Sequence, residues 1–348
     1  MPNGGRSLNR LAFTSVLATA MAAATFAGPA LGVLARFIID DLGITRGELG
    51  FVVAAYSAAG ALASPLVGRV TDQVGGRKAA MGIFLISGLG MMAISAAPGY
   101  WLLIGAAMVT GVGQSAGNPA TNKLISVHIS EGRRGSVTGI KQSGVQVGVF
   151  FAGVALPSSA LAIGWRPTML IAGVAVLTAI VAVRLVVPVD PPQAIQEAAK
   201  RRLNWSAPVM WLMGYGFLMG MAAGSLSTYI PLYGEEGLGL SVPIAGLVAG
   251  LAGLVAVFTR ILWARSSEKR GTYVRTLTWI AALSVLFSAA LLAAPTVGVW
   301  ALWVGALGMG ATAVSWNSVG MLAVMVEAGD ERAGGASGVV LMGFLGGL

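Results

Sequence analysis

Long uncharged, apolar runs alternate with short charged turns along the whole chain. A run of about 20 apolar residues is long enough to cross a bilayer as a helix. Two runs are about twice that length, and each contains a Pro-centred break, at Ala97-Pro98-Gly99 and at Ala294-Pro295-Thr296, so each predicts two helices. The predicted spans lie in residues 11–35, 51–68, 79–122, 142–165, 167–183, 207–232, 243–264, 276–326 and 334–348. The pattern predicts an all-α polytopic membrane protein with ten complete helices and part of an eleventh.

The composition agrees with this pattern and narrows the possible functions. Of the 348 residues 56% are hydrophobic and 10% are charged, whereas soluble domains carry about 25% charged residues. The chain has no cysteine and one histidine, His128, so neither a disulfide nor a metal site is expected. We find no catalytic triad, phosphate-binding Gly-rich loop or other catalytic motif. The sequence therefore predicts a protein that is not an enzyme and has no cofactor.

The distribution of positive charge predicts the orientation. The net charge of +9 comes from Lys and Arg in the turns between apolar runs, which does not favour nucleic-acid binding. With the N-terminus inside, all but three of the 22 Lys and Arg fall on the cytoplasmic side, the exceptions being Arg36, Arg46 and Arg166. Lys123 and Lys141 are interpreted as anchors of helix ends at that interface. A multi-pass protein of the cell (inner) membrane, with a cytoplasmic N-terminus, is expected.

The turn at residues 68–78 carries the most specific motif. It reads GRVTDQVGGRK, that is, Gly68, three residues, Asp72, two residues, Gly75 and the basic pair that follows Gly76. This pattern resembles the loop between helices 2 and 3 of bacterial-type transporters of the major facilitator superfamily. Two positions depart from it, because Gln73 and Gly76 stand where the family often has basic residues. The resemblance implies a bundle of two pseudo-symmetric six-helix halves and secondary transport by alternating access.

An internal repeat supports the resemblance. An offset of 196 places residues 68–73 on residues 264–269, so that Asp72 corresponds to Glu268. An offset of 199 places Gly139, Gly144 and Gly148 on three further glycines near the C-terminus. We expect an N-terminal half at 1–188, a cytoplasmic linker at 189–206 and a C-terminal half at 207–348. Extending the repeat would carry the second half past about residue 380, which predicts that this sequence is C-terminally incomplete.

The resemblance also implies a cytoplasmic gate. Asp72 would meet the N-terminus of the last helix near residues 333–335, where free N–H groups and the helix dipole favour an anion. By the repeat, Glu268 would meet the start of the fifth helix near Ser136, and Arg69 and Arg265 would brace the two carboxylates. These contacts would close the cytoplasmic side while the cavity faces outward. The expected gate residues are Gly68, Arg69, Asp72, Gly75, Arg77, Arg265 and Glu268.

Polar residues inside the spans are candidates for a substrate cavity, because such residues are costly in a membrane and usually face the interior. Gln114, Asn118 and Asn122 form one stripe at four-residue spacing, and Gln142 and Gln146 form another. In the family, helices 1, 4, 7 and 10 line the path. The full set of candidates is Gln114, Asn118, Gln142, Gln146, Tyr229, Trp316, Asn317 and Arg36. The sequence leaves open whether the amides instead bridge packed helices and whether Arg36 only pairs with Asp40.

The kind of solute follows from an absence of charge. No Asp or Glu lies in the middle of a predicted span, so a neutral or anionic small solute is favoured over a lipophilic cation, which would need a buried counter-charge. Multidrug/proton antiport is the alternative, although Ala107 stands where such antiporters carry an Arg. A non-transporting receptor or scaffold also stays open. The expected partners are a small-molecule substrate and the lipid bilayer, and the protein is expected to be a monomer. Whether a proton or another ion is coupled to transport is left open.

Overall fold

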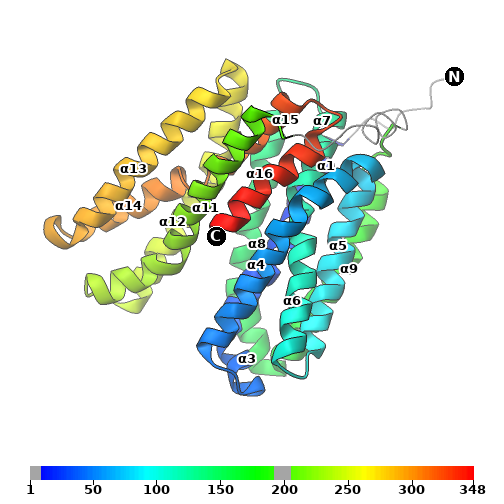
Figure 1. Ribbon diagram of the computed structural model, residues 1–348. Helices are drawn as coiled ribbons and strands as arrows, with labels where there is room; N and C mark the ends of the chain where they lie inside the picture. The colour runs from blue at the N-terminus through cyan, green and yellow to red at the C-terminus, as the bar shows by residue number, and fades with distance from the viewer. Residues whose placement is uncertain (1–8, 192–204) are drawn as a thin grey trace.

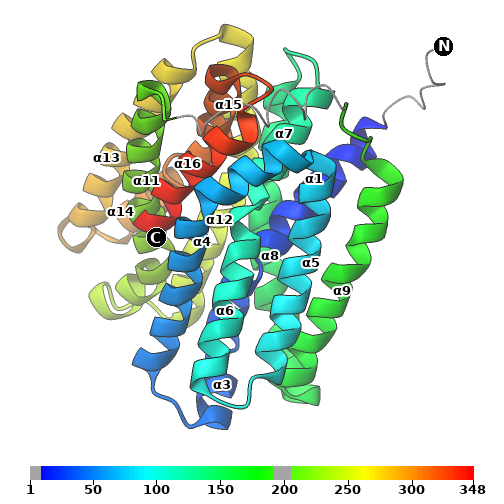
Figure 2. The ribbon, with the colours of Figure 1, turned by 45° about the vertical axis from the view of Figure 1, so that its right-hand side comes forward.

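The computed structural model describes residues 9–191 and 205–348, and this part of the chain folds as a bundle of helices without strands (Figures 1 and 2). The predicted all-α class is confirmed. From residue 9 to 191 the helices are α1 (Arg10–Thr25), α2 (Ala27–Val33), α3 (Ala35–Leu42), α4 (Arg46–Val74), α5 (Gly76–Ala96), α6 (Tyr100–Ser115), α7 (Gly117–His128), α8 (Arg134–Ile163) and α9 (Trp165–Val186). From residue 205 they are α11 (Ala207–Leu232), a π-helical turn at Tyr233–Gly237, α12 (Val242–Arg270), α13 (Tyr273–Val297), α14 (Val299–Ala311), α15 (Trp316–Ala328) and α16 (Ala333–Gly347).

Eight helices in the described residues are long and apolar enough to cross a membrane, with α14 and α15 taken together as one of them. The pair α1 and α2, which is bent by 50°, would make a ninth. The 15-residue helix α16 is apolar but shorter, and the stretch predicted as one fourth helix is divided into α6 and α7. The predicted total of eleven spans therefore stays a prediction.

Glycines and a capping box set several helix ends. Thr45 begins α4 with a capping box, in which its side chain accepts from the backbone of Glu48 while the Glu48 carboxylate accepts from the backbone of Thr45. The predicted break at 97–99 is confirmed by the gap between α5 and α6. The second break differs from the prediction, because α13 continues through Pro295 to Val297 and is followed by Gly298, whose φ of 112° is one that glycine adopts readily.

The buried apolar side chains form clusters, most of which lie within one of the two described parts of the chain, residues 9–191 or residues 205–348. One cluster is drawn from residues 209–340, and a second from residues 27–169. A third is drawn from residues 13–187 and is joined by Leu322, Met325 and Ala333. The two parts contact each other where α16 packs on α4 and where α12 packs on α8 (Figure 1). On its other side α16 packs on α11. The outer flanks are α5 and α9 on one side and α13 and α14 on the other (Figure 1).

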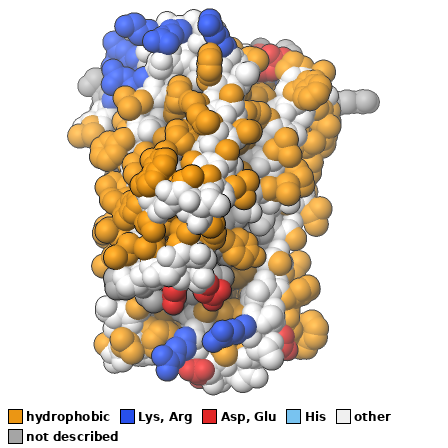
Figure 3. Space-filling model, turned by 90° about the vertical axis from the view of Figure 1, so that its left-hand side faces the viewer, with side chains coloured by type: hydrophobic (Ala, Val, Ile, Leu, Met, Phe, Trp, Pro, Cys, Tyr) orange, Lys and Arg blue, Asp and Glu red, His pale blue; other side chains and the backbone are white. Residues whose placement is uncertain are grey.

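The surface fits a lipid environment. Figure 3 shows hydrophobic side chains over the middle of one face, with charged side chains gathered towards the two ends. Large apolar side chains such as Leu62, Trp101 and Leu292 are at least 79% exposed, and an apolar surface this continuous is unusual for a soluble monomer. We call the end of the bundle where α1 begins and α12 ends, marked by Arg10, Lys78 and Arg270, the basic end.

The opposite end is tied together by Arg166. Its guanidinium pairs with Asp41 at 2.9 Å and donates to the carbonyls of Ser95 and Ala97 at 3.0 and 2.7 Å. It thereby joins α3, α5 and α9.

We expect Arg166→Ala to lower the free energy of unfolding by about 2 kcal/mol, because two carbonyls lose a charged donor while the partly exposed ion pair contributes little. The measurement is the thermal unfolding midpoint of the purified protein. Arg36→Ala is the matched control, since Arg36 has a 91% exposed side chain and reaches Asp40 only at 3.8 Å. Equal midpoints for the two variants would contradict the prediction.

Candidate functional site

At the basic end a buried carboxylate of α4 caps the N-terminus of α16. Asp72 accepts hydrogen bonds from the backbone N–H groups of Gly334 and Gly335, at 3.0 and 2.6 Å. These donors lie in the first turn of α16, where the backbone N–H groups have no partner within the helix. The approach is close, because a Cβ atom added to Gly68 would lie 2.5 Å from the carbonyl oxygen of Gly334. The contact implied by the resemblance is therefore present.

The charged partner of Asp72 is Lys123 of α7, not Arg69. Its Nζ lies 3.5 Å from Oδ1 of Asp72, and it donates to the carbonyls of Asp330 and Glu331 at 2.8 and 3.0 Å. The side chain of Lys123 is 1% exposed, so the interpretation of Lys123 as an interfacial anchor is wrong. It is buried because the loop between α15 and α16 covers it with carbonyl oxygens.

The second carboxylate makes the corresponding contact across the bundle. Glu268, near the end of α12, accepts a hydrogen bond of 2.8 Å from the backbone N–H of Gly135 in the first turn of α8. Arg69 and Arg265 have exposed side chains, and the structure records no ion pair between either of them and these carboxylates. The expected bracing by the two arginines is not seen in the described residues, where both side chains are exposed at the surface.

Gly75 and Arg77 attach to a different neighbour. The backbone N–H of Arg77 donates to Asp190 at 2.9 Å, and its guanidinium donates to the carbonyl of Arg184 at 2.7 Å. Burial opposes the charged form of Asp190, but His128 and the backbone N–H groups of Gly76 and Arg77 outweigh it and lower the pKa of Asp190. These residues fasten the end of α9 to the turn between α4 and α5. The rest of the predicted linker, residues 192–204, lies outside the described residues.

A fully buried polar cluster lies further from the basic end, between α7 and α8. Lys141 donates from Nζ to Asn118 at 3.0 Å, to Thr121 at 2.8 Å and to Asn122 at 2.6 Å. Gln142 donates to the same Asn118 oxygen at 2.7 Å, and Asn122 donates across to Ser337 of α16 at 2.7 Å. We call Asn118, Thr121, Asn122, Lys141 and Gln142 the α7–α8 cluster.

Lys141 is thus 0% exposed, and its interpretation as an interfacial anchor is also wrong. The predicted span began at residue 142 because Lys141 was taken as a charge outside the membrane. In the structure α8 begins at Arg134, so Lys141 lies two turns inside the helix. The signal in the sequence was that Lys141 directly precedes Gln142, one of the polar residues identified within this apolar run.

Arg260 of α12 was missed entirely as a site residue. It is 2% exposed and donates to the carbonyl of Gln142 at 2.6 Å and to that of Val314 at 2.9 Å. The carbonyl of Val314 is available because the helix is interrupted between α14 and α15. A charge inside the predicted span 243–264 was the signal that could have identified Arg260.

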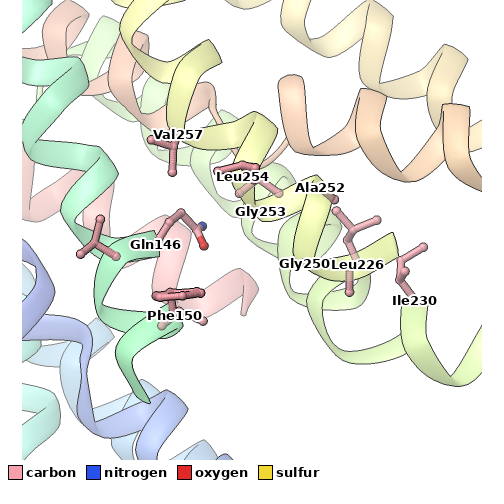
Figure 4. A pocket seen from close by; sticks show the side chains of 13 residues that line it. Gln146, Phe150, Leu226, Ile230, Gly250, Ala252, Gly253, Leu254 and Val257 are labelled. Carbon is pink, nitrogen blue, oxygen red and sulfur yellow. The ribbon is translucent and has the colours of Figure 1, made fainter. Parts of the chain in front are cut away.

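A cavity of about 580 Å³ lies between α8 and the helices α11 and α12 (Figure 4). Gln146 and Phe150 project into it from α8, opposite Gly253, Leu226 and other apolar residues (Figure 4). Val257 and Val314 also line this cavity. Val314 is the residue whose carbonyl binds Arg260, so the cavity reaches the surroundings of the buried guanidinium.

The other predicted candidates are scattered. Trp316 is buried against Tyr215 and Phe344, with ring centroids 5.5 and 5.7 Å away. Neither its Nε1 nor Oδ1 of Asn317 has a hydrogen-bond partner in the described residues. Gln114 is half-buried, and its Oε1 also has no partner there. Tyr229 is 60% exposed, and Arg36 stays at the far rim. The structure brings together Asn118 and Gln142, places Gln146 at the cavity, and does not join the rest to them.

Comparisons with known proteins agree on one family. The model of the Major Facilitator Superfamily matches residues 12–348. A hexuronate transporter of Bacillus subtilis is 26% identical over 137 residues, which are 39% of this chain and 32% of that protein. A probable sulfoacetate transporter, SauU, of Cupriavidus necator is 23% identical over 241 residues, 64% of this chain and 56% of that protein. The matched segments thus span between about a third and just over half of these relatives.

Two solved structures share the fold. The proton:xylose symporter XylE, bound to 6-bromo-6-deoxy-D-glucose, superposes with a TM-score of 0.76 at 15% identity, covering 97% of this chain and 86% of that one. The transporter FucP in the outward conformation superposes with a TM-score of 0.71 at 14% identity, covering 96% of this chain and 89% of that one. At such identities the likeness concerns the fold alone.

Proposed function

The chain belongs to the major facilitator superfamily, and on that premise we propose that it carries a small organic solute across a membrane by secondary active transport. The solute is neutral or anionic, and the mechanism is alternating access between the two sides. The chain is divided at residues 189–206 into an N-terminal half and a C-terminal half, with about eleven membrane helices. The N-terminus and the basic end face the cytoplasm, and the bundle lies in the cell membrane.

The observation that carries this proposal is the pair of carboxylate contacts at the basic end. The contact of Asp72 with Gly334 and Gly335 joins the N-terminal half to the start of α16 in the C-terminal half. The contact of Glu268 with Gly135 joins the C-terminal half to the start of α8 in the N-terminal half. Such contacts stabilise a state that is closed at this end, and transport requires a second state in which they are broken. The cavity beside Gln146 lies between the same halves and away from the closed end.

Matching helix bounds support two related halves. The bounds of α4 and α12 differ by 196 residues at both ends, which is the offset of the repeat. The interruptions between α6 and α7 and between α14 and α15 also correspond, since an offset of 197 places Ala116 on Ala313. Interrupted helices at the interface of repeats are where transporters of this kind bind substrates.

The solute class rests on charge. Away from their ends the described spans carry no acidic side chain, and Asp72, near the end of α4, is already held by Lys123 and two backbone N–H groups. Two of the relatives are named for the transport of hexuronate and of sulfoacetate, which are organic anions. A proton or sodium gradient is the candidate driving force, as the XylE symporter uses protons.

Uptake into proteoliposomes tests the function directly. We expect saturable uptake of at least one of D-glucuronate, sulfoacetate or D-xylose by the full-length protein, enhanced by an imposed proton or sodium gradient. Asn118→Ala should reduce uptake at least tenfold, because Lys141 and Gln142 both lose their shared acceptor.

The control is Thr178→Ala. The hydroxyl of Thr178 is exposed and donates a hydrogen bond to the carbonyl of Ala175 in its own helix, α9. Saturable transport of a quaternary ammonium dye, without transport of any carboxylate or neutral solute, would replace this proposal by multidrug efflux. The absence of any transport would favour a receptor or scaffold. Wild-type uptake by Asn118→Ala would remove the α7–α8 cluster from the site.

A further inference from the structure

Two buried cations in the interior of the bundle have no acidic partner among the residues that the structure describes. Lys141 and Arg260 are 0% and 2% exposed. All three hydrogen bonds of Lys141 go to neutral side-chain oxygens, and those recorded for Arg260 go to backbone carbonyls. By contrast, buried Lys123 and Arg134 lie within 3.5 Å of Asp72 and Asp330, respectively. Within residues 9–191 and 205–348, the structure records no salt bridge for Lys141 or Arg260.

An uncompensated charge in a membrane interior is costly, and such residues usually lie at solute or ion sites. Packing alone does not explain these two, because an apolar side chain of similar size would fill the space without the desolvation penalty. Their cost is offset only in part by neutral oxygens. An anion that entered the site would supply the missing negative charge.

The two cations belong to one connected site. Lys141 binds Oδ1 of Asn118, the same oxygen binds Gln142, and the carbonyl of Gln142 binds Arg260. The connection crosses from α8 to α12, between the two halves that the transport cycle would move apart. A ligand held by both cations would therefore contact both halves.

The site also has spare hydrogen-bonding capacity. Nε of Arg260 and Oε1 of Gln142 have no partner within the described residues. A guanidinium has five N–H donors and binds planar oxyanions in a two-pronged geometry, and the two hydrogen bonds recorded here use only its Nη atoms. Val314, whose carbonyl accepts from Nη2 of Arg260, also lines the cavity together with Val257, so the cavity passes close to this guanidinium.

We propose that Lys141 and Arg260 form the binding site for a carboxylate or sulfonate group, and that the transported solute is therefore a small organic anion. The inference rests on the proposed transport function and narrows its substrate class. Arg260 receives the oxyanion from the cavity, and Lys141 exchanges neutral oxygens of Asn118, Thr121 and Asn122 for it. Gln142 fixes the positions of the two cations relative to each other, because it contacts both Arg260 and the Asn118 oxygen that binds Lys141.

Binding is measured on the full-length protein in nanodiscs by the rise of its unfolding midpoint with added solute, since a ligand of the folded state stabilises it. The probes are D-glucuronate, sulfoacetate and D-glucose. Glucuronate and glucose differ only in having a carboxylate or a hydroxymethyl group at C6. We expect one or both anions to raise the midpoint, and glucose to leave it unchanged.

Lys141→Gln and Arg260→Gln should each weaken binding of that anion about tenfold to a hundredfold, the usual effect of losing one charged hydrogen-bond partner. Lys141→Arg keeps the charge and should retain more affinity than Lys141→Gln. Arg275→Gln is the control, because it removes an exposed charge from the first turn of α13 and should bind as the wild type does.

The results separate this inference from the transport function. Stabilisation by glucose equal to that by glucuronate, or unchanged anion affinity in both Gln variants, would overturn the anion site even if uptake occurs. Stabilisation by an anion that is lost in the variants would support the site even if proteoliposomes show no uptake, in which case only the transport function fails. If the Gln variants do not fold, competition decides: inhibition of glucuronate uptake by sulfoacetate but not by glucose supports the site, and equal inhibition by glucose overturns it.

Discussion

Replacing Asp72 by asparagine is expected to open the basic end of the bundle. The carboxylate accepts two backbone hydrogen bonds from α16 and lies beside Lys123. Asparagine keeps the size but removes the charge and turns one acceptor into a donor that faces an N–H group. Breaking a buried charged pair costs about 3–5 kcal/mol, so the closed state should lose at least about a hundredfold in relative population.

The opening is measurable as a distance between two spin labels. The chain has no cysteine, so labels can be attached at Lys78→Cys on α5 and Arg270→Cys on α12, both exposed at the basic end. We expect the distance between the labels to lengthen and its distribution to broaden in Asp72→Asn. Glu327→Gln, which removes an exposed carboxylate from α15, should give the wild-type distribution. An unchanged distance in Asp72→Asn would show that Asp72 does not hold this end closed.

The second large effect is expected from Gly338→Leu in α16. A Cβ atom at Gly338 would overlap the carbonyl oxygen of Ser64 in α4 and lie 3.2 Å from the Cα of Gly68. Both neighbours are backbone atoms and cannot rotate away, so the helices must separate. Overpacking a well-packed contact commonly costs 1–3 kcal/mol and occasionally more, and we expect the upper end of that range here.

Uptake by Gly338→Leu should fall at least tenfold, while the label distance at the basic end increases. The matched control is Gly153→Leu in α8, because a Cβ atom there would have no neighbour within 4 Å. Loss of uptake with an unchanged label distance would mean that Gly338 acts on the solute path and not on closure.

Much of the fold could be predicted because a membrane leaves few choices. In hydrocarbon every backbone polar group needs a partner within the protein, so a long uncharged run implies a helix. The pattern at residues 68–78 further implied the contact of Asp72 with α16, through resemblance to a family in which that loop is characteristic. The interruption between α6 and α7 was not predicted, although Gly117 and the Asn118-Pro119 pair, a combination typical of turns, follow it directly.

The candidate site was predicted only in part. Asn118 and Gln142 were identified because an amide in an apolar run is conspicuous, and the structure joins them. Lys141 and Arg260 were placed at the membrane surface, because a long basic side chain near the end of an apolar run usually extends to the interface.

For this protein, the order of apolar runs and the loop motif were sufficient to establish helices, family and the carboxylate that caps α16. Those features depend on local composition and on spacing along the chain. The burial of Lys141 and Arg260 was decided by tertiary structure, because it depends on what other helices place beside them. The oxygens of α7 and the carbonyl of Val314, in the turn between α14 and α15, come from distant positions, and only their convergence allows two positive charges to stay inside the bundle.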